Sequence, residues 1–271
     1  MEPAAFDVRE FARTAQGSLR DDLDLTRYAA APLRGDVVRV LDALAVLEGA
    51  TMAHLRNVLV TPTHKDARVT AFLVTWAYEK FWIADALRAI VAANGGAPRG
   101  WSGAASDAGT HRRAASAGRG PVRRALAGFA QGWPVIGVHM TVGLVDDWML
   151  RAAYERVARA SANDALDAVL RRILDVKERH TRFFQEEASR RLAASPKAAG
   201  LARRELARTV WPLGSTVLGR DDRDDLVRFV FGGSEGDVLA ARLERDIADL
   251  PGLDRRAAAS VLRGLAGGPA A

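Results

Sequence analysis

Residues 72–87, FLVTWAYEKFWIADAL, and residues 171–184, RRILDVKERHTRFF, carry the features that decide the fold. In each stretch apolar residues recur at three- and four-residue steps, which is the period of an amphipathic helix. Each stretch also places a lysine, Lys80 or Lys177, at an inward-facing position of that helix. Only four of the 39 basic residues are lysine, so chance is a poor explanation for two of them at such positions.

The helical period extends over most of the chain and predicts an all-α fold. From residue 33 to residue 60 the apolar residues recur at helical steps, and Glu48 fills the one vacant slot, so that it faces inward. Asn163 and Ser195 are expected to cap helix N-termini, and Gly95 and Gly96 to end a helix. Helices are predicted over residues 33–60, 65–94, 121–131, 134–160 and 163–194, from residue 195 onward, and near residues 221–231, 235–249 and 254–265. We expect an N-terminal segment at 1–33, a main helical region at 34–195 and a C-terminal helical extension at 196–271.

Composition narrows the class of protein. The chain has no cysteine, which excludes disulfides, thiolate metal sites and cysteine nucleophiles. Charged residues interrupt the N-terminus, and no apolar run reaches the roughly 20 residues of a membrane span. We therefore expect a cytoplasmic protein without membrane contact. We find no glycine-rich phosphate loop, Walker motif or Ser-His-Asp arrangement, so nucleotide hydrolysis has no support.

The net charge of +6 comes mainly from residues 96–125. The charged residues of this stretch are Arg99, Arg112, Arg113, Arg119, Arg123 and Arg124 against Asp107 alone. Because the stretch is rich in Gly, Ala and Ser and lacks apolar periodicity, we interpret residues 96–120 as a basic crossover loop. It is either a solvated loop or a flap over an anionic ligand. No aromatic residues alternate with the arginines, so we do not expect nucleic acid as a partner.

Polar residues at inward positions repeat between the two halves of the chain. Glu48 is followed by Lys80 and Ile83, 32 and 35 residues later, and Asp147 by Lys177 and His180, 30 and 33 residues later. A spacing of three residues places each pair on one helix face. Two helix pairs joined by a long crossover are expected to bring all six positions toward one point.

The four predicted long helices resemble the ferritin-like superfamily of di-iron carboxylate proteins, more closely its desaturase-like and actinobacterial members. The similarity covers about residues 35–195 and rests on four stretches in order. These are LEGATMAHLRNVL (47–59), FLVTWAYEKFWIADAL (72–87), GLVDDWMLRAAYERV (143–157) and RRILDVKERHTRFF (171–184). The resemblance implies a four-helix bundle with a long crossover loop, here followed by extra C-terminal helices.

The metal site of that family uses one glutamate on the first and third helices and Glu-x-x-His on the second and fourth. Carried over by position, Glu48 and His180 are kept and Asp147 is a shortened acid. The other three positions depart, because Lys80, Ile83 and Lys177 stand where the family has two glutamates and a histidine. A neighbouring register offers Glu79 or Glu178, but each is one residue, about 100°, away from the inward face.

The charges of Glu48, Lys80, Asp147 and Lys177 sum to zero without a metal, so we predict no metal and no cofactor. Two interpretations of the cluster remain open: salt bridges that fill a vacated metal cavity, or a metal-independent active site. We favour a metal-independent enzyme that acts by proton transfer on a small anionic or acyl substrate in specialised metabolism. The alternatives are a non-catalytic binding or scaffold protein and a di-metal oxidoreductase with a reduced ligand set. A homodimer is also possible.

Roles within the predicted site follow from side-chain chemistry. Burial lowers the pKa of a lysine, whereas Glu48 and Asp147 raise it, and the sequence does not decide which influence is larger. We assign the lowered pKa to Lys177 rather than Lys80, because His180 lies one turn away from Lys177 as a proton relay. Tyr154 lies two turns after Asp147 and is a further candidate, and His139 lies two turns before it. We expect His54 and His64 to be exposed, and Trp76 and Trp82 beside Lys80 to serve packing.

Overall fold

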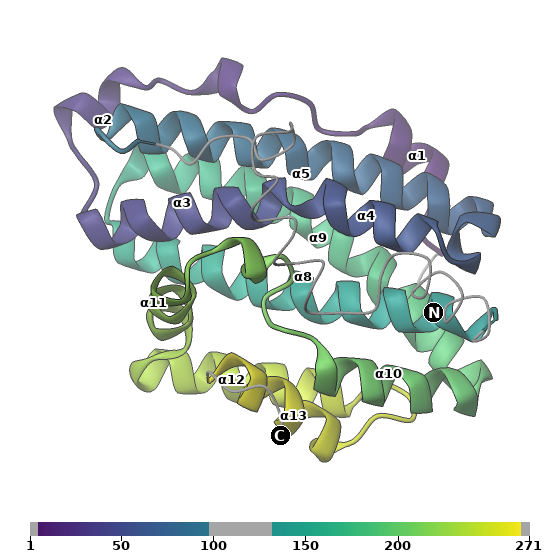
Figure 1. The fold of residues 1–271 in the computed structure, drawn as a ribbon. Helices are drawn as coiled ribbons and strands as arrows, with labels where there is room; N and C mark the ends of the chain where they lie inside the picture. The colour runs from purple at the N-terminus through teal and green to yellow at the C-terminus, as the bar shows by residue number, and fades with distance from the viewer. Residues whose placement is uncertain (1–4, 98–131, 267–271) are drawn as a thin grey trace.

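The structure is a computed structural model that describes residues 5–97 and 132–266, and it contains helices but no strand within these ranges (Figure 1). The longer helices of its main part are α3 (Gly35–Gly49), α4 (Thr51–Leu59), α5 (Ala67–Ala93), α8 (Pro134–Ser161) and α9 (Asp164–Ala194). The remaining elements are α1 (Val8–Arg13), η1 (Arg20–Asp22), α2 (Thr26–Ala30), η2 (Pro62–Lys65), α10 (Pro196–Arg208), η3 (Ser215–Val217), α11 (Arg220–Phe231), α12 (Gly233–Ala248) and α13 (Arg255–Leu265). The all-α prediction is confirmed for the described residues. The predicted helix at 121–131 and nearly all of the basic loop lie outside them.

Local capping sets most helix boundaries where the sequence predicts them. The Asn163 side chain accepts a hydrogen bond from Leu166 N at 3.0 Å, and Ser195 Oγ accepts one from Ala198 N at 3.1 Å. Gly95, just after α5, has φ +75°, a left-handed conformation that favours glycine.

The helix predicted over residues 33–60 is divided into α3 and α4 at Ala50. Two distant segments pack at this junction. A Cβ on Gly49 would lie 2.6 Å from the guanidinium of Arg88, and a Cβ on Gly214 would lie 2.8 Å from Ala50. The division therefore coincides with tertiary contacts that the local sequence does not reveal.

The long helices pair along their length. In Figure 1, α3 and α4 run beside α5, and α8 runs beside α9; contacts of α3 with α8 and of α5 with α9 join the two pairs. The α8–α9 approach is close, because a Cβ on Gly143 of α8 would lie 2.5 Å from the ring of Phe184 on α9. The C-terminal helices α10, α12 and α13 pack against α8 or against each other and share one hydrophobic cluster with α5, α8 and α9.

The N-terminal segment lies along α5 and is fixed at one end of the long helices. Phe11 stacks on Phe72 of α5 at 5.2 Å between ring centroids, and the Phe6 ring meets Phe183 of α9 edge to face. The backbone of Phe6 is held on both sides: its N–H donates to Glu186 Oε2 at 2.7 Å, and its carbonyl accepts from Arg68 Nη2 at 3.0 Å.

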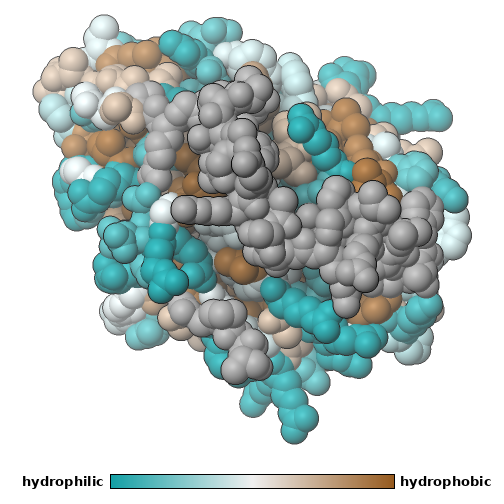
Figure 2. Space-filling view, in the orientation of Figure 1, coloured by the Kyte–Doolittle hydropathy of each residue, from teal (hydrophilic) through white to brown (hydrophobic). Residues whose placement is uncertain are grey.

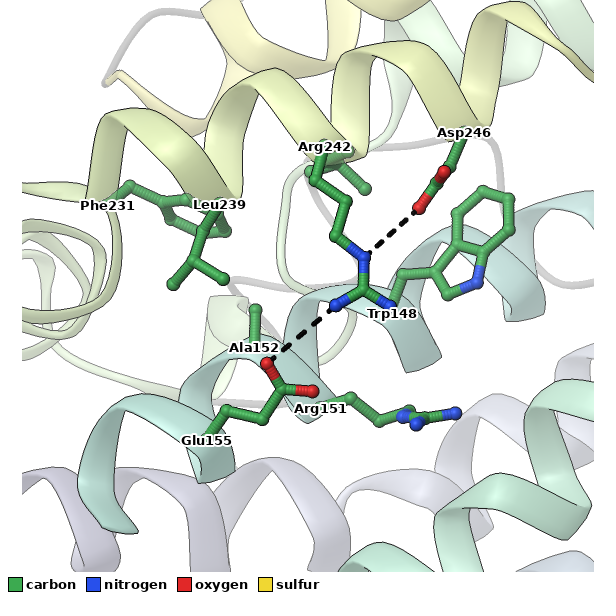
Figure 3. A pocket seen from close by; sticks show the side chains of 9 residues that line it. Trp148, Arg151, Ala152, Glu155, Phe231, Leu239, Arg242 and Asp246 are labelled. Atoms are coloured by element: carbon green, nitrogen blue, oxygen red, sulfur yellow. Dashed lines mark ion pairs between the residues drawn. The ribbon is translucent and has the colours of Figure 1, made fainter. Parts of the chain in front are cut away.

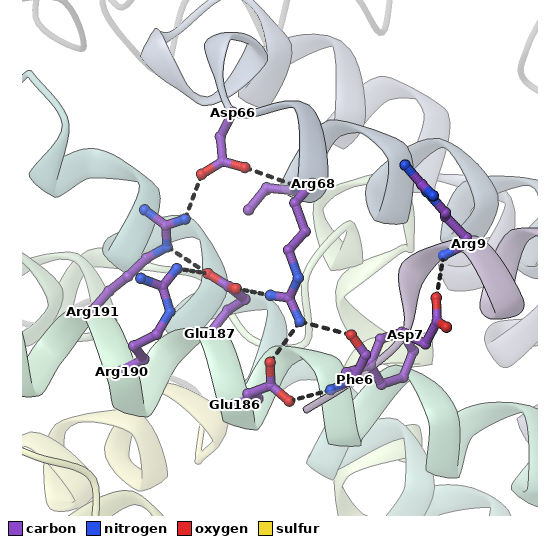
Figure 4. A network of polar contacts seen from close by, with 10 residues as sticks. Phe6, Asp7, Arg9, Asp66, Arg68, Glu186, Glu187, Arg190 and Arg191 are labelled. Atoms are coloured by element: carbon purple, nitrogen blue, oxygen red, sulfur yellow. Dashed lines mark hydrogen bonds and ion pairs between the residues drawn. The ribbon is translucent and has the colours of Figure 1, made fainter. Parts of the chain in front are cut away.

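These contacts belong to a polar network that we call the end network (Figure 4). It consists of Asp66, Arg68, Glu186, Glu187, Arg190 and Arg191. Glu187 is fully buried and accepts from all three arginines; Arg190 and Arg191 lie 2.7 Å from its Oε2. The network therefore joins the start of α5, the second half of α9 and the N-terminal segment.

Hydrophilic and hydrophobic residues are interspersed on the face of the molecule seen in Figure 2. Met52, Val60 and Trp133 are among the large apolar residues that are exposed. Within the described ranges, no helix combines the length and the apolar character needed to cross a membrane.

Candidate functional site

Four charged side chains, one from each long helix, meet in the interior. Glu48 of α3 receives both lysines: Lys80 Nζ of α5 lies 2.9 Å from its Oε2, and Lys177 Nζ of α9 lies 2.8 Å from its Oε1. Lys177 Nζ also lies 3.4 Å from Asp147 Oδ1 of α8. We call Glu48, Lys80, Asp147 and Lys177 the core ion cluster. The structure therefore brings together four of the six positions that the sequence nominates.

Two neutral side chains donate further hydrogen bonds to the carboxylates. Tyr154 donates to Glu48 Oε1 at 2.9 Å, which places this predicted site residue in direct contact with the cluster. Thr181 donates to Asp147 Oδ2, and its oxygen lies 3.0 Å from the carbonyl oxygen of Lys177. The sequence interpretation missed Thr181, although its position one turn after Lys177 on the same helix was an available signal.

The cluster is closed to solvent. Its four side chains are at most 3% exposed, and aromatic rings cover the ammonium groups. Lys80 Nζ lies 4.9 Å from the ring centroid of Trp76, and Lys177 Nζ lies 5.8 Å from that of Tyr154. Both distances fall within the range of cation–π attraction.

The neighbouring charges decide the protonation of the cluster. Burial raises the pKa of Glu48, but Lys177 and Lys80 outweigh it and bring that pKa down to about 2. Burial lowers the pKa of Lys177, but Glu48 and Asp147 outweigh it, so this pKa lies above its ordinary value. Glu48 and Lys177 therefore both stay charged near neutral pH. The prediction that burial would bring the Lys177 pKa down toward neutrality is wrong for this reason.

His180 pairs with Glu79 rather than with a residue of the core ion cluster, although Asp147 and Lys177 influence its pKa, and Ile83 offers no polar group to the cluster. His180 Nε2 lies 2.6 Å from Glu79 Oε2, and Ile83 packs in an apolar cluster with α3 and α8. Burial lowers the pKa of His180 against the influence of Glu79, so its imidazole is neutral near pH 7 and donates from Nε2. Its Nδ1 has no hydrogen-bond partner among the described residues.

Glu79 is buried although its helical position points away from the cluster. Residues of the N-terminal segment and α9 cover it: Gln16 N donates to Glu79 Oε1 at 2.7 Å, and Arg179 Nη2 lies 2.5 Å from the same oxygen. The helical period alone describes one inward face of α5, whereas the N-terminal segment buries a second face. Glu178, the other neighbouring acid, is exposed and pairs with Arg151 at 2.5 Å.

Asp146, the residue before Asp147, is also buried beside the cluster, and the sequence analysis did not predict it as a site residue. Its Oδ1 accepts a hydrogen bond from Leu213 N at 2.8 Å, and burial raises its pKa to about 6. The sequence did contain a signal, because Asp146 directly precedes the inward-facing Asp147. Adjacent side chains of a helix point about 100° apart, so Asp146 faces a different packing partner of α8. That partner is the loop after α10.

Two histidines lie half-buried near this region. His139 Nδ1 lies 2.8 Å from Thr63 Oγ1, and burial together with His54 lowers the His139 pKa to about 3. Burial and the charge of Lys80 lower the pKa of His54 to about 4. The expectation that His54 is exposed is therefore wrong, because α8 and the turn η2 lie close to it. His64 is exposed as expected.

The residues at the family positions do not fit a di-metal centre. An ammonium group lies against each oxygen of Glu48, and a protonated lysine cannot ligate a cation. Among the described residues, no group of three or more His, Asp or Glu side chains is arranged to hold a metal ion.

A surface groove lies between α8 and α12, and one of the side chains that line it is linked by hydrogen bonds to the core ion cluster (Figure 3). The space inside the groove is about 30 Å³, and Trp148 and Leu239 are among its apolar walls. Arg242 lies 3.9 Å from Glu155 and 3.7 Å from Asp246 across it. Arg151 also lines the groove, and its Nη1 donates to Thr181 Oγ1 at 3.2 Å. Arg151 and Thr181 thus connect the groove to Asp147.

In comparisons with known proteins, no family model, no curated protein and no solved structure matches the chain. Its described residues therefore define an all-helical protein with a buried cluster of two acidic and two basic side chains.

Proposed function

We propose that the chain is a ferritin-like four-helix bundle protein in which the core ion cluster takes the place of a di-metal centre, and that it acts as a non-catalytic binding or scaffold protein. The observation that carries the proposal is the position of Glu48 between two lysines, at 2.9 and 2.8 Å. Each charge of the cluster is already neutralised by another, so no charge is left to act on a substrate.

Two observations support the ferritin-like part of the proposal: the order of the helices, and the fact that each charged residue of the cluster comes from a different helix. Two helix pairs, α3 with α5 and α8 with α9, are separated by the long connection at residues 94–133. The four cluster residues come from four different helices, as metal ligands do in di-iron bundles. Ile83 and His180 depart from that pattern.

The non-catalytic part is supported by the protonation of Lys177. A lysine that acts as a base or as a Schiff-base amine must be neutral for part of the time. Glu48 and Asp147 instead raise the pKa of Lys177 above its ordinary value. The arrangement therefore favours a fixed ion pair over a proton carrier.

Amine-reactive labelling tests this proposal, and the chain supplies its own references. Lys65 and Lys197 are exposed, whereas Lys80 and Lys177 are buried. After brief treatment with acetic anhydride at about pH 8, where an ordinary lysine is about 0.4% neutral, we expect acetylation of Lys65 and Lys197 alone. Unfolded protein should be acetylated at all four. Acetylation of Lys177 in the folded protein as fast as at Lys197 would contradict the proposal.

Metal content tests the replacement of the di-metal centre separately. Protein produced in iron-rich medium should contain well under one equivalent of iron or manganese by elemental analysis, because ammonium groups repel the cation. Two bound equivalents would contradict the proposed replacement and would favour the di-metal oxidoreductase.

The second candidate is the metal-independent enzyme, and one observation favours it. Asp146 is buried next to the cluster with a pKa of about 6, so it can exchange a proton near neutral pH. Lys80 influences the pKa of both Asp146 and His54, which places these groups in one region. If the protein is this enzyme, Asp146 rather than Lys177 is the base that acts on a small anionic or acyl substrate.

A comparison of variants distinguishes this candidate from the first. Asp146→Asn keeps an oxygen for Leu213 N but removes the titration, while Lys177→Arg keeps the charge at the cluster. Wild-type protein and the two variants are incubated with a small-molecule extract, and the extract is compared by mass spectrometry. A compound consumed by wild type and by Lys177→Arg, but not by Asp146→Asn, supports the enzyme. Consumption of no compound supports the binding or scaffold role.

A further inference from the structure

The C-terminal helices α10 and α13 carry an excess of positive charge. α10 holds four basic residues and one acidic residue, and α13 holds three basic residues and no acidic residue. By contrast, α11 and α12 each hold more acidic than basic residues. Within the described C-terminal residues, positive charge is therefore concentrated on α10 and α13.

Most of these cations lie in a row on the solvent-facing side of their helix. On α10, Lys197, Arg204 and Arg208 are separated by seven and four residues, so they share one side of the helix. On α13, Arg256 and Arg263 are separated by seven residues. All five residues are exposed, whereas apolar residues on the opposite side of each helix are buried. We call these five residues the basic face.

The two helices of the basic face pack against each other and run in the same direction. A Cβ on Gly252, just before α13, would lie 2.7 Å from Ala199 near the start of α10. A Cβ on Gly264, near the end of α13, would lie 3.7 Å from the carbonyl oxygen of Thr209, just after α10. The two rows of cations therefore follow neighbouring, parallel helices, which lie below α8 in Figure 1.

The charges of the basic face have no carboxylate partner. Within residues 5–97 and 132–266, four of the five side chains make no hydrogen bond or ion pair, namely those of Lys197, Arg208, Arg256 and Arg263. Arg204 donates from Nε to the carbonyl oxygen of Gly200, on its own helix, at 3.3 Å. The basic face therefore differs from the end network, where each arginine lies against a glutamate.

The other side chains of the two helices narrow the class of partner. The exposed large apolar residues of the described chain include none from α10 or α13, so the basic face offers neither the apolar centre of a protein interface nor side chains that insert into a bilayer. Neither helix contains an aromatic residue, on which single-stranded nucleic acids stack their bases. Arginines without these features suit phosphate groups, which a guanidinium binds through two N–H groups at once.

We propose that the basic face binds the phosphate backbone of double-stranded DNA without reading its sequence. Contacts from arginine and lysine to phosphates supply the affinity of such binding. Duplex RNA is recognised partly through its 2′-hydroxyls, but α10 contains no neutral hydrogen-bonding side chain and α13 contains only Ser260. The expectation of no nucleic-acid partner rests on residues 96–125 and on base stacking, which a duplex does not require.

DNA binding at this face goes beyond the proposed function, because none of its residues belongs to the core ion cluster. Fluorescence anisotropy with a labelled duplex of mixed sequence measures it. The full chain should bind the duplex at about 0.05 M salt, and the logarithm of the binding constant should fall linearly as the logarithm of the salt concentration rises.

A triple variant of the basic face tests which residues hold the duplex. Arg208→Gln/Arg256→Gln/Arg263→Gln removes three phosphate contacts, so the salt slope should become smaller by about 2–3 and the affinity at about 0.05 M salt at least tenfold lower. Because these three arginines make no contact inside the described protein, the variant should fold as wild type does. Thermal unfolding followed by circular dichroism checks this.

Two control variants separate the basic face from net charge and from the core ion cluster. Arg9→Gln/Arg39→Gln/Arg171→Gln removes three exposed arginines of α1, α3 and α9, and its salt slope should stay within about 0.5 of the wild-type slope. Glu48→Gln/Lys80→Met changes only the core ion cluster and should also bind the duplex as wild type does. A failure of this inference is therefore distinct from a failure of the proposed function.

Three results would overturn the proposal: no duplex binding at about 0.05 M salt, an equal loss of affinity in the two triple variants, or tighter binding of single-stranded DNA than of the duplex. Vesicles that contain phosphatidylserine test the other anionic surface. If the basic-face variant loses vesicle binding while its duplex binding is unchanged, the face belongs to a membrane surface and the proposal is wrong.

Discussion

The core ion cluster and the end network hold buried carboxylates with different cations. In the cluster, Glu48 lies between two lysines, and every charged side chain is at most 3% exposed. In the end network, Glu187 is fully buried but its partners are arginines, of which Arg190 is 59% exposed. The two sites differ in whether the cationic groups can reach solvent after their carboxylate partner is removed.

A lysine enclosed by four helices cannot regain water without opening the protein. An arginine at the end of the helices keeps part of its guanidinium in solvent, and its planar fork serves two carboxylates at once, as Arg191 does with Asp66 and Glu187. The charges of the cluster thus depend on one another in a closed space, whereas we expect the end network to lose less stability when one of its members is removed.

Removal of Glu48 should have the largest effect on stability. Glu48→Ala leaves two buried ammonium groups with one carboxylate, and breaking a buried ion pair costs about 3–5 kcal/mol. Urea unfolding followed by circular dichroism measures the loss. Glu178→Ala, which removes an exposed glutamate of α9, serves as the matched control and should change stability by less than about 1 kcal/mol.

The pH dependence of that effect isolates the charge of Glu48. Its pKa of about 2 lies below the ordinary value of 4.5, so the stability it contributes is present above about pH 4.5 and is lost as pH falls toward 2. The difference in unfolding free energy between wild type and Glu48→Gln should shrink by on the order of 3 kcal/mol over this range. A difference that stays constant between about pH 5 and 3 would show that Glu48 is not held by charge.

Removal of Glu187 should cost less than removal of Glu48 despite equal burial. Glu187→Ala frees three arginines, of which Arg68 and Arg190 are already partly solvated, so we expect a loss of about 1–3 kcal/mol. The same urea unfolding experiment compares the two alanine variants directly. A loss at Glu187 that equals or exceeds the loss at Glu48 would remove the distinction between the two networks.

Replacement of an opposite pair should have the smallest effect. Glu48→Gln/Lys80→Met removes one charge of each sign at similar volume, leaving Lys177 with Asp147. Because well-packed neutral residues often replace buried ion pairs without loss, stability should stay within about 2 kcal/mol of wild type. A double-mutant cycle with the two single variants should give a strongly favourable coupling energy between Glu48 and Lys80.

The sequence predicts helix boundaries well where the determinants are local. Asn163 and Ser195 cap helices through their own side chains, within three residues of the bonds they accept. The division at Ala50 is different, because Arg88 and Gly214 approach it from other parts of the chain. Periodicity describes one helix at a time and contains no information about such contacts.

The candidate site shows the same limit. Helical period and spacing place the four cluster residues and Tyr154 on inward faces, and the structure has these side chains in contact in the shared interior. The partner of His180 was not predictable in this way, because the N-terminal segment buries Glu79 on another face of α5. The direction of the Lys177 pKa depends on the 2.8 Å and 3.4 Å distances to Glu48 and Asp147, which only the folded structure supplies.

The ionisation of Lys177 is the most direct test of the proposed charge-balanced, non-catalytic cluster. With only four lysines in the chain, selective ¹³C labelling gives a spectrum in which each Cε signal is assignable from single Lys→Arg variants. The raised pKa of Lys177 adds stability that is present below about pH 10.5 and is lost as pH rises through the folded-state value, so its signal should not titrate between about pH 6 and 10. A Lys177 signal that titrates near neutral pH would contradict the account and would return Lys177 to the role of a catalytic base.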